Sequence, residues 1–586
     1  MPANKNEIVR GVRRFTVLVT VLMASAGVKA LENKTALPPS HAAKGAADIA
    51  EADAAFAPWA SPATPGCALG VLKDGKVLYS HGYGLADVEH SVPITPTTVF
   101  HIASVSKQFT AFAIYLLATE GKLSIDDDVR KYLPELHDFH RTITIRNLLN
   151  HTSGLRDQWT LLTMAGWRLA DRITEQDILS LVWRQRELNF PPGEEQIYSN
   201  TGYTLLALIA ERVSGQSLRE FTRERIFVPL GMQHTHFQDH YGDLVQNRAY
   251  SYERQPDGGY RYVALSYSTV GPSSLFTTVE DLARWDENFY TGEVGGKALL
   301  EQMQLPGKLN GGRQTDYAAG LVIGKYRGLE TVEHGGADAG FRAELLRFPD
   351  AHFSVITLCN AGDADASDLA YRVADIFLNS QLEPLATPRP GLRPVELQMD
   401  PRVLNADVGY YQFGPGLVLA ISREGDQLLA QLTGQQKAPI FPSSNTSFVL
   451  GVAGAQLTFD GATDGAQSQG VTLHQGDGHD HYARRIESAH LTPERMRAYT
   501  GSFYSDELDT LYTVSSRDGR LFVRYPRGES ELKPTVTNTF EAVLPFATVN
   551  YRCSADSRCD TFTVMNGRVR GLRFDRVDLT PTSHRR

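Results

Sequence analysis

Residues 101–117, HIASVSKQFTAFAIYLL, combine the pattern of a buried helix with two polar residues that such a helix does not need. Apolar residues recur at helical spacing from Phe109 onward, and Gly121 is a typical stop. Ser104 therefore stands at or just inside the helix N-terminus, where free N–H groups and the dipole favour negative charge on oxygen. Lys107 lies three residues later on the same helix face. A lysine kept from water loses its proton more readily and can act as a base.

Alone, this stretch could be an ordinary helix start, because chance supplies about one or two Ser-x-x-Lys matches in a chain of this length. Two further motifs weaken that alternative. Tyr198-Ser199-Asn200 follows a Pro-Pro-Gly loop and precedes an amphipathic helix, offering a phenol for proton relay and an amide for a substrate carbonyl. His334-Gly335-Gly336 ends a strand-like run, and its glycines allow another backbone to approach. Separately, these are a buried tyrosine, a turn asparagine and a histidine before a hairpin. Together and in this order, they favour a catalytic site.

The chain resembles the penicillin-recognising serine hydrolases of peptidase S12 type, which include class C β-lactamases, DD-peptidases, D-aminopeptidases and related esterases. The family motifs Ser-x-x-Lys, Tyr-x-Asn and Lys/His-x-Gly correspond to residues 104–107, 198–200 and 334–336. The phrase LLNHTSGLRDQ at 148–158 is also similar to family sequences. The resemblance covers about residues 50–380. It implies an α+β fold, an antiparallel sheet flanked by helices beside a helical subdomain, with the site in the cleft between them.

The resemblance also implies a role for each residue of the site. Ser104 is expected to be the acylated nucleophile, with Lys107 and Tyr198 sharing the general-base work. Backbone N–H groups of Ser104 and Ala337 are expected to form the oxyanion hole. His334 is expected to close the pocket and to hydrogen-bond near Tyr198 or the substrate. The expected substrate contacts come from Asn200, Gln158, Gly335, Gly336 and Arg342.

The histidine of the third motif bears on the substrate. β-Lactamases of this family carry Lys-Thr-Gly there, whose lysine supplies a fixed positive charge for a substrate carboxylate, whereas His334 is mostly neutral at pH 7. Amide, aminopeptidase or ester substrates are therefore favoured. Arg342 could restore the cation, and with it a β-lactamase or DD-carboxypeptidase activity. An alternative of another class is a penicillin-binding sensor that is acylated and deacylates slowly.

Composition limits the partners. The net charge of −9 over 586 residues, with no long basic run, argues against nucleic acid. We expect a small peptide, amide or ester substrate, with cell-wall-derived compounds among the candidates. No cofactor motif is found, and no metal site is predicted. The histidine-rich stretch LHQGDGHDHY (473–482) lacks zinc-site spacing and is better explained as a surface loop.

The N-terminus predicts export. Basic residues up to Arg14 precede the apolar stretch FTVLVTVLMASAGV, which is too short to span a bilayer and ends in small residues. We predict a cleaved signal peptide over residues 1–30 and a periplasmic or secreted protein, with an uncleaved signal anchor as the alternative. Four cysteines then become candidates for disulfides. Cys553 and Cys559 are expected to close a hairpin, while Cys67 and Cys359 are either buried thiols or a cross-strand pair.

The chain is predicted to divide into a hydrolase domain at 45–383, a proline-rich linker at 384–397 and a duplicated C-terminal half. The hydrolase domain opens with a hairpin around Asp74-Gly75. Two small antiparallel barrels or sandwiches, lipocalin-like in form, are expected at 398–487 and 488–586. The duplicated positions are Gly409 and Gly501, Leu428 and Leu521, and Phe448 and Phe540, at offsets of 92, 93 and 92 residues.

Overall fold

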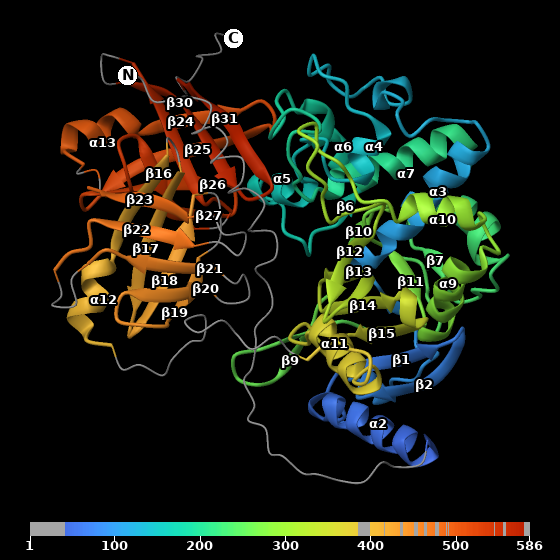
Figure 1. The fold of residues 1–586 in the computed structure, drawn as a ribbon. Helices are drawn as coiled ribbons and strands as arrows, with labels where there is room; N and C mark the ends of the chain where they lie inside the picture. The colour runs from blue at the N-terminus through green and yellow to red at the C-terminus, as the bar shows by residue number, and fades with distance from the viewer. Residues whose placement is uncertain are drawn as a thin grey trace.

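A computed structural model of the chain describes residues 41–384, 399–414, 417–433, 437–450, 455–461, 466–474, 480–487, 489, 491–543, 545–554 and 558–578. The predicted signal peptide lies outside the described residues, as does the predicted linker except for its first residue. Figure 1 shows a hydrolase domain, in blue to yellow, beside two barrels in orange and red.

One six-stranded antiparallel sheet forms the base of the hydrolase domain. Its strand order is β12-β13-β14-β15-β1-β2, so the hairpin that opens the domain pairs with a strand from its end. Asp74 and Gly75 form the predicted hairpin turn, with φ values of 50° and 72°. Cys67 and Cys359 face each other on β1 and β15 and form a disulfide, which decides for the cross-strand pair. The strands are β1 (Cys67–Lys73), β2 (Lys76–Tyr83), β12 (Val322–Tyr326), β13 (Leu329–Asp338), β14 (Phe341–Phe348) and β15 (Phe353–Cys359).

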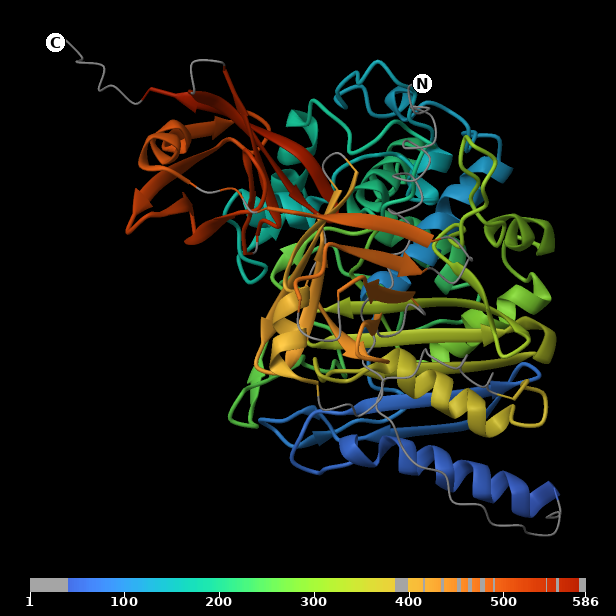
Figure 2. The same ribbon diagram turned by 60° about the vertical axis from the view of Figure 1, so that its left-hand side comes forward.

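Helices cover both faces of this sheet. α2 (His41–Phe56) and α11 (Ala366–Phe377) lie side by side along one face (Figure 2), where they share a core with residues such as Leu69 of β1. Successive side chains of a strand point to opposite faces, so Leu72 joins the larger core on the other side. There α9 (Val279–Thr291) packs on β1 and β15.

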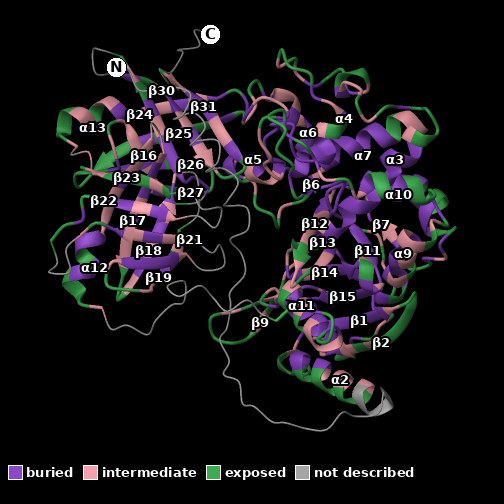
Figure 3. Ribbon diagram, viewed as in Figure 1, coloured by how far each residue is buried: buried purple, intermediate pink, exposed green. Residues whose placement is uncertain are grey.

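A helical subdomain lies beside the sheet. At its centre α3 and α7 pack together and are buried along most of their length (Figure 3). Thr174 forms a capping box with Asp177 at the start of α6, and Gly215 ends α7 with a φ of 75°. No helix among the described residues is long and apolar enough to cross a membrane. The helices are α3 (Lys107–Thr119), α4 (Ile145–Leu149), α5 (Gln158–Met164), α6 (Glu175–Arg184), α7 (Asn200–Ser214), α8 (Leu218–Thr222) and α10 (Lys297–Met303).

Short elements complete the hydrolase domain. β5, β11 and β7 form a small sheet next to Ser104, and β5 ends just before the turn that contains this residue. The other short strands form two-stranded sheets. The strands are β3 (Leu85–Asp87), β4 (Val92–Pro93), β5 (Phe100–His101), β6 (Ile173–Thr174), β7 (His236–Phe237), β8 (Tyr252–Arg254), β9 (Tyr260–Tyr262), β10 (Tyr267–Ser268) and β11 (Leu275–Thr277). The helical turns are η1 (Ala57–Trp59), η2 (Ala103–Ser106), η3 (Val129–Lys131), η4 (Arg223–Phe227) and η5 (Pro349–Ala351).

The C-terminal half forms two closed antiparallel barrels, as the repeat predicts. Each barrel is preceded by a short helix, which the sequence pattern did not predict. Barrel 1 consists of α12 (Pro401–Asp407), β16 (Gly409–Gly414), β17 (Leu417–Glu424), β18 (Gln427–Leu432), β19 (Ala438–Pro442), β20 (Ser447–Leu450), β21 (Ala455–Phe459), β22 (Gly470–His474) and β23 (Asp480–Ile486). Barrel 2 consists of α13 (Pro493–Tyr499), β24 (Gly501–Ser505), β25 (Thr510–Arg517), β26 (Arg520–Tyr525), β27 (Gly528–Pro534), β28 (Thr539–Glu541), β29 (Thr548–Cys553), β30 (Cys559–Asn566) and β31 (Val569–Val577). Cys553 and Cys559 form the predicted disulfide.

The two barrels share a detail that explains the repeated glycines. Arg485 of β23 and Arg576 of β31 each donate to backbone carbonyls at the C-terminal end of the helix that precedes their barrel. A Cβ on Gly409 or Gly501 would lie 2.2 or 2.1 Å from the corresponding guanidinium. Glycine at the start of each barrel therefore leaves room for the arginine that caps its helix.

The barrels differ in how they join the hydrolase domain. The apolar interior of barrel 1 forms a core of its own. That of barrel 2 is continuous with the core of the helical subdomain. The hydroxyl of Tyr512 in β25 donates to the backbone carbonyl of Met164 in α5, at 2.6 Å. Barrel 2 is thus packed against the subdomain that carries half of the candidate site.

Candidate active site

Ser104 lies in the tight turn η2, directly before α3. The α-helix proper begins at Lys107, so Ser104 precedes it rather than forming its first residue. Ala103 has a φ of 47°, an uncommon conformation for a residue with a side chain. The Ser106 hydroxyl donates to the Ala103 carbonyl at 2.5 Å and accepts from the Leu275 N–H at 3.1 Å. These bonds hold the turn so that Ser104 is partly exposed among buried neighbours.

Lys107 is fully buried next to Ser104. Its Nζ lies 3.1 Å from Ser104 Oγ, 2.9 Å from Asn200 Oδ1 and 2.7 Å from the Pro272 carbonyl oxygen. The ring of Tyr198 faces it, with the centroid 4.7 Å from Nζ. A neutral amine has two N–H bonds and one lone pair. The two carbonyl oxygens can accept both N–H bonds, which leaves the lone pair for the hydroxyl of Ser104.

The surroundings of Lys107 favour the neutral amine. Burial lowers the pKa of Lys107 well below its ordinary value, and the Arg568 cation lowers it further, while Asp157 and Asp338 act in the opposite direction. Among the described residues, no carboxylate lies within ion-pair distance of Lys107 Nζ. The neutral form is the one that can accept a proton.

Tyr198 shows the opposite shift. Its hydroxyl is buried and has no hydrogen-bond partner of standard geometry among the described residues. Burial raises the pKa of Tyr198, with the nearby Ser104 hydroxyl and the Arg568 cation as smaller opposing influences. The surroundings of Ser104 therefore favour a neutral amine, which can accept a proton, and a neutral phenol, which can donate one.

Asn200, the first residue of α7, is held by a carboxylate from the neighbouring segment. Its backbone N–H and its Nδ2 each donate to Asp157 Oδ2, at 2.8 Å. The other carboxylate oxygen of Asp157 accepts from the first N–H groups of α5. Since the amide nitrogen is held by Asp157, the amide oxygen points to Lys107. The geometry thus makes Asn200 a partner of Lys107, with one amide N–H left over.

His334 is buried at the edge of the site. Its Nδ1 lies 2.6 Å from the Gly335 carbonyl oxygen, and its Nε2 lies 2.9 Å from the Tyr317 hydroxyl. A carbonyl can only accept, so this network assigns the proton to Nδ1 and makes Nε2 the acceptor. Burial, together with Lys107, lowers the pKa of His334 to about 3. His334 is therefore neutral, and its Nε2 accepts from the Tyr317 hydroxyl, while the Tyr198 ring lies 6.2 Å away between centroids.

One edge of β13 borders the candidate site, next to the turn η2. Pairing of β13 with β12 ends at Glu333, so within the described residues 334–338 pair only with β14 on one side. The other edge packs on η2. A Cβ on Gly336 would lie 2.3 Å from the Ile102 carbonyl oxygen, so only glycine allows this close approach. Ala337 therefore lies on a strand edge next to the turn of Ser104, as an oxyanion hole formed by both residues requires.

The family model described as Beta-lactamase matches residues 51–377. The chain belongs to the β-lactamase family. It is a serine hydrolase of that family, with a β-lactamase/transpeptidase-like domain followed by two lipocalin-like barrels.

Individual relatives match a larger part of the chain than the family model does. Penicillin-binding protein 4* of Bacillus subtilis (strain 168) is 31% identical over 418 residues, covering 67% of this chain and 90% of the relative. A D-aminopeptidase of Brucella melitensis biotype 2 is 25% identical over 477 residues, covering 80% and 85%. The solved structure of the octameric penicillin-binding protein homologue from Pyrococcus abyssi has the same fold, with a TM-score of 0.52, 23% identity and coverage of 84% and 99%.

Two residues expected at the site of this β-lactamase-family hydrolase are placed elsewhere. Gln158 is fully buried, and its side-chain oxygen accepts from the Thr204 hydroxyl at 2.8 Å, so it presents no surface to a substrate. Arg342 pairs with Ala337, whereas His334 pairs with Leu345. Side chains alternate between faces, so Arg342 lies on the face of the sheet opposite to His334. Its guanidinium donates to carbonyls of its own hairpin and cannot supply the cleft with a cation.

Other residues of the site were not predicted. Asp157 lies next to Gln158 in the family-like phrase at 148–158, and this phrase is the signal that could have identified it. His151, from the same phrase, lies between Tyr198 and Tyr317, with ring centroids 4.2 and 4.4 Å from theirs. Arg568 comes from barrel 2, and nothing in the local sequence signals that it reaches the hydrolase domain.

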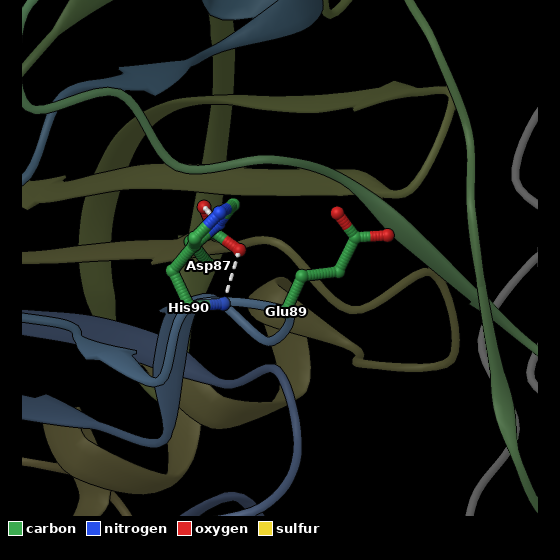
Figure 4. Close-up of side chains that lie close together, drawn as sticks. All are labelled: Asp87, Glu89 and His90. Atoms are coloured by element: carbon green, nitrogen blue, oxygen red, sulfur yellow. Dashed lines mark hydrogen bonds and ion pairs between the residues drawn. The ribbon is translucent and has the colours of Figure 1, made fainter.

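One group of side chains among the described residues has the spacing of a metal site, namely Asp87, Glu89 and His90 between β3 and β4 (Figure 4). His90 Nδ1 lies 2.7 Å from Asp87 Oδ2, and the His90 N–H donates to the other oxygen of that carboxylate. These bonds account for the arrangement as a turn. Glu89 and His90 are exposed, and we assign no ion to the group.

Proposed function

We propose that the protein is an exported hydrolase that cleaves amide or ester bonds through an acyl-enzyme on Ser104. The observation that carries the proposal is the 3.1 Å contact between Lys107 Nζ and Ser104 Oγ, made by a buried amine without a carboxylate partner among the described residues. Such an amine is a base that the fold holds ready beside a hydroxyl.

The proposed acylation moves the Ser104 proton to the lone pair of Lys107 while Oγ attacks the substrate carbonyl carbon. The oxyanion that forms accepts from the backbone N–H groups of Ser104 and Ala337. The carbonyl carbon's bond to the leaving nitrogen or oxygen then breaks. The buried hydroxyl of Tyr198, which has no other acceptor of standard geometry among the described residues, donates the proton that the leaving group takes. Lys107 then passes its extra proton to the Tyr198 phenolate, which restores the neutral amine and the neutral phenol. Water attacks the resulting ester with Lys107 as the base, and the Ser104 oxygen leaves and takes that proton back.

The proposed substrates are small peptides, amides or esters, with cell-wall-derived compounds among them. The similarity to a D-aminopeptidase supports a peptide or amide. Export is supported by the N-terminal apolar stretch and by the two disulfides, because disulfides persist in oxidising compartments. A second candidate is a penicillin-binding protein that deacylates slowly, which the 31% identity to Penicillin-binding protein 4* favours.

A substrate panel tests the proposal. Wild type and Ser104→Ala are compared on p-nitroanilides of D- and L-amino acids, p-nitrophenyl esters and nitrocefin. We expect turnover of at least one ester or amide by wild type and none above background by Ser104→Ala. A burst without turnover would favour the slow penicillin-binding protein. Equal turnover by both chains would contradict the assignment of Ser104.

A further inference from the structure

The turn between β30 and β31 carries an arginine from barrel 2 to the candidate site. Asn566 pairs with Val569, so Gly567 and Arg568 form a two-residue hairpin tip, and Gly567 has a φ of 45°. The Arg568 guanidinium lies over the ring of Tyr198, with Cζ 4.9 Å from the centroid. The barrel thus adds a cation to a cleft whose other residues come from the hydrolase domain.

The hydrolase domain holds the backbone of this turn on both sides of the arginine. Asn189 Nδ2 donates to the Arg568 carbonyl at 2.9 Å, and Asn189 Oδ1 accepts from the Arg570 N–H at 2.7 Å. The Asp157 N–H also donates to the Arg568 carbonyl, at 3.3 Å. These bonds use only backbone atoms of the turn. The turn should therefore keep its place when the side chain of Arg568 is replaced.

The guanidinium of Arg568 has no charged partner among the described residues. The side chain is exposed, and no hydrogen bond or ion pair of its guanidinium occurs among the described residues. The carboxylates near the turn have other partners. Glu195 pairs with Arg570 at 3.1 Å, and Asp157 accepts from Asn200 and from the start of α5. The face of Tyr198 holds the guanidinium while its N–H fork stays free.

We propose that Arg568 binds an anionic group of the substrate, of carboxylate type, beside the scissile bond, so that barrel 2 sets the substrate preference of the hydrolase domain. The proposal rests on the proposed function, since it concerns the substrate of the acyl-enzyme on Ser104. A planar guanidinium with free N–H bonds matches a carboxylate with two parallel hydrogen bonds. Arg568 thereby takes the role that was expected of Arg342, because Arg342 lies on the face of the sheet opposite to His334.

Three matched esters test this proposal: phenyl acetate, m-carboxyphenyl acetate and phenyl hydrogen succinate. The first is neutral, the second carries a carboxylate on the leaving group, and the third carries one on the acyl group. The measurement is kcat/KM for each anionic ester divided by that for phenyl acetate, within one preparation, which cancels the folded fraction. We expect Arg568→Ala to lower this ratio about 10- to 100-fold for at least one anionic ester. The ester that responds shows on which side of the scissile bond the anion lies.

Two controls make the result decisive. Arg568→Lys keeps the charge and should keep part of the ratio, and Arg573→Ala removes the same charge from β31 beyond the turn and should leave the ratio unchanged. The wild-type ratio should also fall as salt is added. Unchanged ratios in Arg568→Ala for both anionic esters, or an equal loss in Arg573→Ala, would overturn the proposal. Failure of the proposed function is a separate outcome, in which Ser104→Ala hydrolyses all three esters like wild type.

Discussion

Lys107 is a buried amine whose neighbours are aromatic rings and uncharged acceptors. The rings of Tyr198 and Tyr203 face Nζ at 4.7 and 5.6 Å, and the guanidinium of Arg568 also lies over the Tyr198 ring, with Cζ 4.9 Å from its centroid. Two protein features, removal of water and a nearby positive charge, therefore act in the same direction on its pKa. The residue can be a base because the fold has removed what would normally keep it protonated.

The pH dependence of the reaction should report this amine. Since the neutral form of Lys107 is the active one, kcat/KM should rise with pH through a pKa below 10.5, the ordinary lysine value. Arg568→Ala removes a cation that lowers this pKa, so the rising limb should move to higher pH.

Lys107→Ala should lower kcat by about 10²–10⁴-fold and remove the limb. The measurement is the rate on a neutral ester over pH, with melting curves as a check on folding. A limb that persists unchanged in a folded Lys107→Ala chain would assign it to another group.

The neutral state of His334 has a consequence for stability. Its pKa is lowered to about 3 in the folded chain, against about 6.5 in the unfolded chain. The unfolded state binds the proton first, so the stabilising contribution is complete above pH 6.5 and is lost as pH falls toward 3. The free energy of unfolding of wild type relative to His334→Gln, measured with urea, should therefore shrink between pH 7 and pH 4. A difference that stays constant over this range would mean that His334 is not held neutral.

At the scale of elements, the segment from Arg156 to Gln158 joins barrel 2 to the site. Arg156 is fully buried, donates to the Arg570 carbonyl of β31 and pairs with Glu507 at 2.5 Å. The next residue, Asp157, binds the Arg568 carbonyl and positions Asn200. One short stretch of chain therefore connects the tip of a barrel hairpin to the partner of Lys107.

Loss of the Glu507 charge should destabilise the folded chain. Glu507→Gln keeps the shape but leaves the buried guanidinium of Arg156 with only the exposed carboxylate of Glu187, at 3.9 Å. Breaking a buried ion pair in this way typically costs about 3–5 kcal/mol. The free energy of unfolding is measured by urea denaturation. Glu529→Gln is the matched control, because Glu529 pairs with Arg517 at the surface of the same barrel, and it should have little effect. Equal effects of the two substitutions would show that the buried pair is not special.

The sequence motifs predicted the central residues of the candidate site, but they missed Asp157 and His151 and misplaced Gln158 and Arg342. The pairing of Ser104 with Lys107 was predictable from their helical spacing, and the resemblance to the family motifs predicted that Tyr198 would join them. The side of a sheet on which Arg342 lies depends on the register between β13 and β14, which no local pattern records. Arg568 is more than 360 residues from Tyr198 along the chain, and its place is set by the packing of a whole barrel. The hairpin at Asp74-Gly75 was predictable because its turn residues form a local signal. The two barrels were predictable because the sequence repeats one pattern of strands and turns.

At the scale of the whole molecule, barrel 2 and the hydrolase domain form one packed unit. Its core is continuous with that of the helical subdomain, while the core of barrel 1 is separate. The barrel also covers Arg156 and supplies Arg568. Similar barrels made by duplication thus have different relations to the site.

A chain that ends at residue 384 should be less stable than the full chain. Truncation divides the apolar core that the helical subdomain shares with barrel 2 and leaves Arg156 without its partners in barrel 2. We expect a melting temperature lower by more than about 10 °C, since each kcal/mol lost in a domain of this size lowers it by about 2–4 °C. Differential scanning calorimetry of both chains gives the comparison. A truncated chain that melts with the full chain would show that the hydrolase domain folds independently of barrel 2.

The most direct test of the central claim, that Ser104 is activated by a neutral Lys107, is the site of covalent labelling by a fluorophosphonate. Intact mass and peptide mapping are carried out on wild type, Lys107→Ala and Ser104→Ala after incubation with the reagent. The account predicts one adduct per wild-type chain, located on the peptide with Ser104, much slower labelling of folded Lys107→Ala, and none in Ser104→Ala. Labelling of Ser104→Ala to the same extent as wild type, or an adduct on another serine, would contradict it.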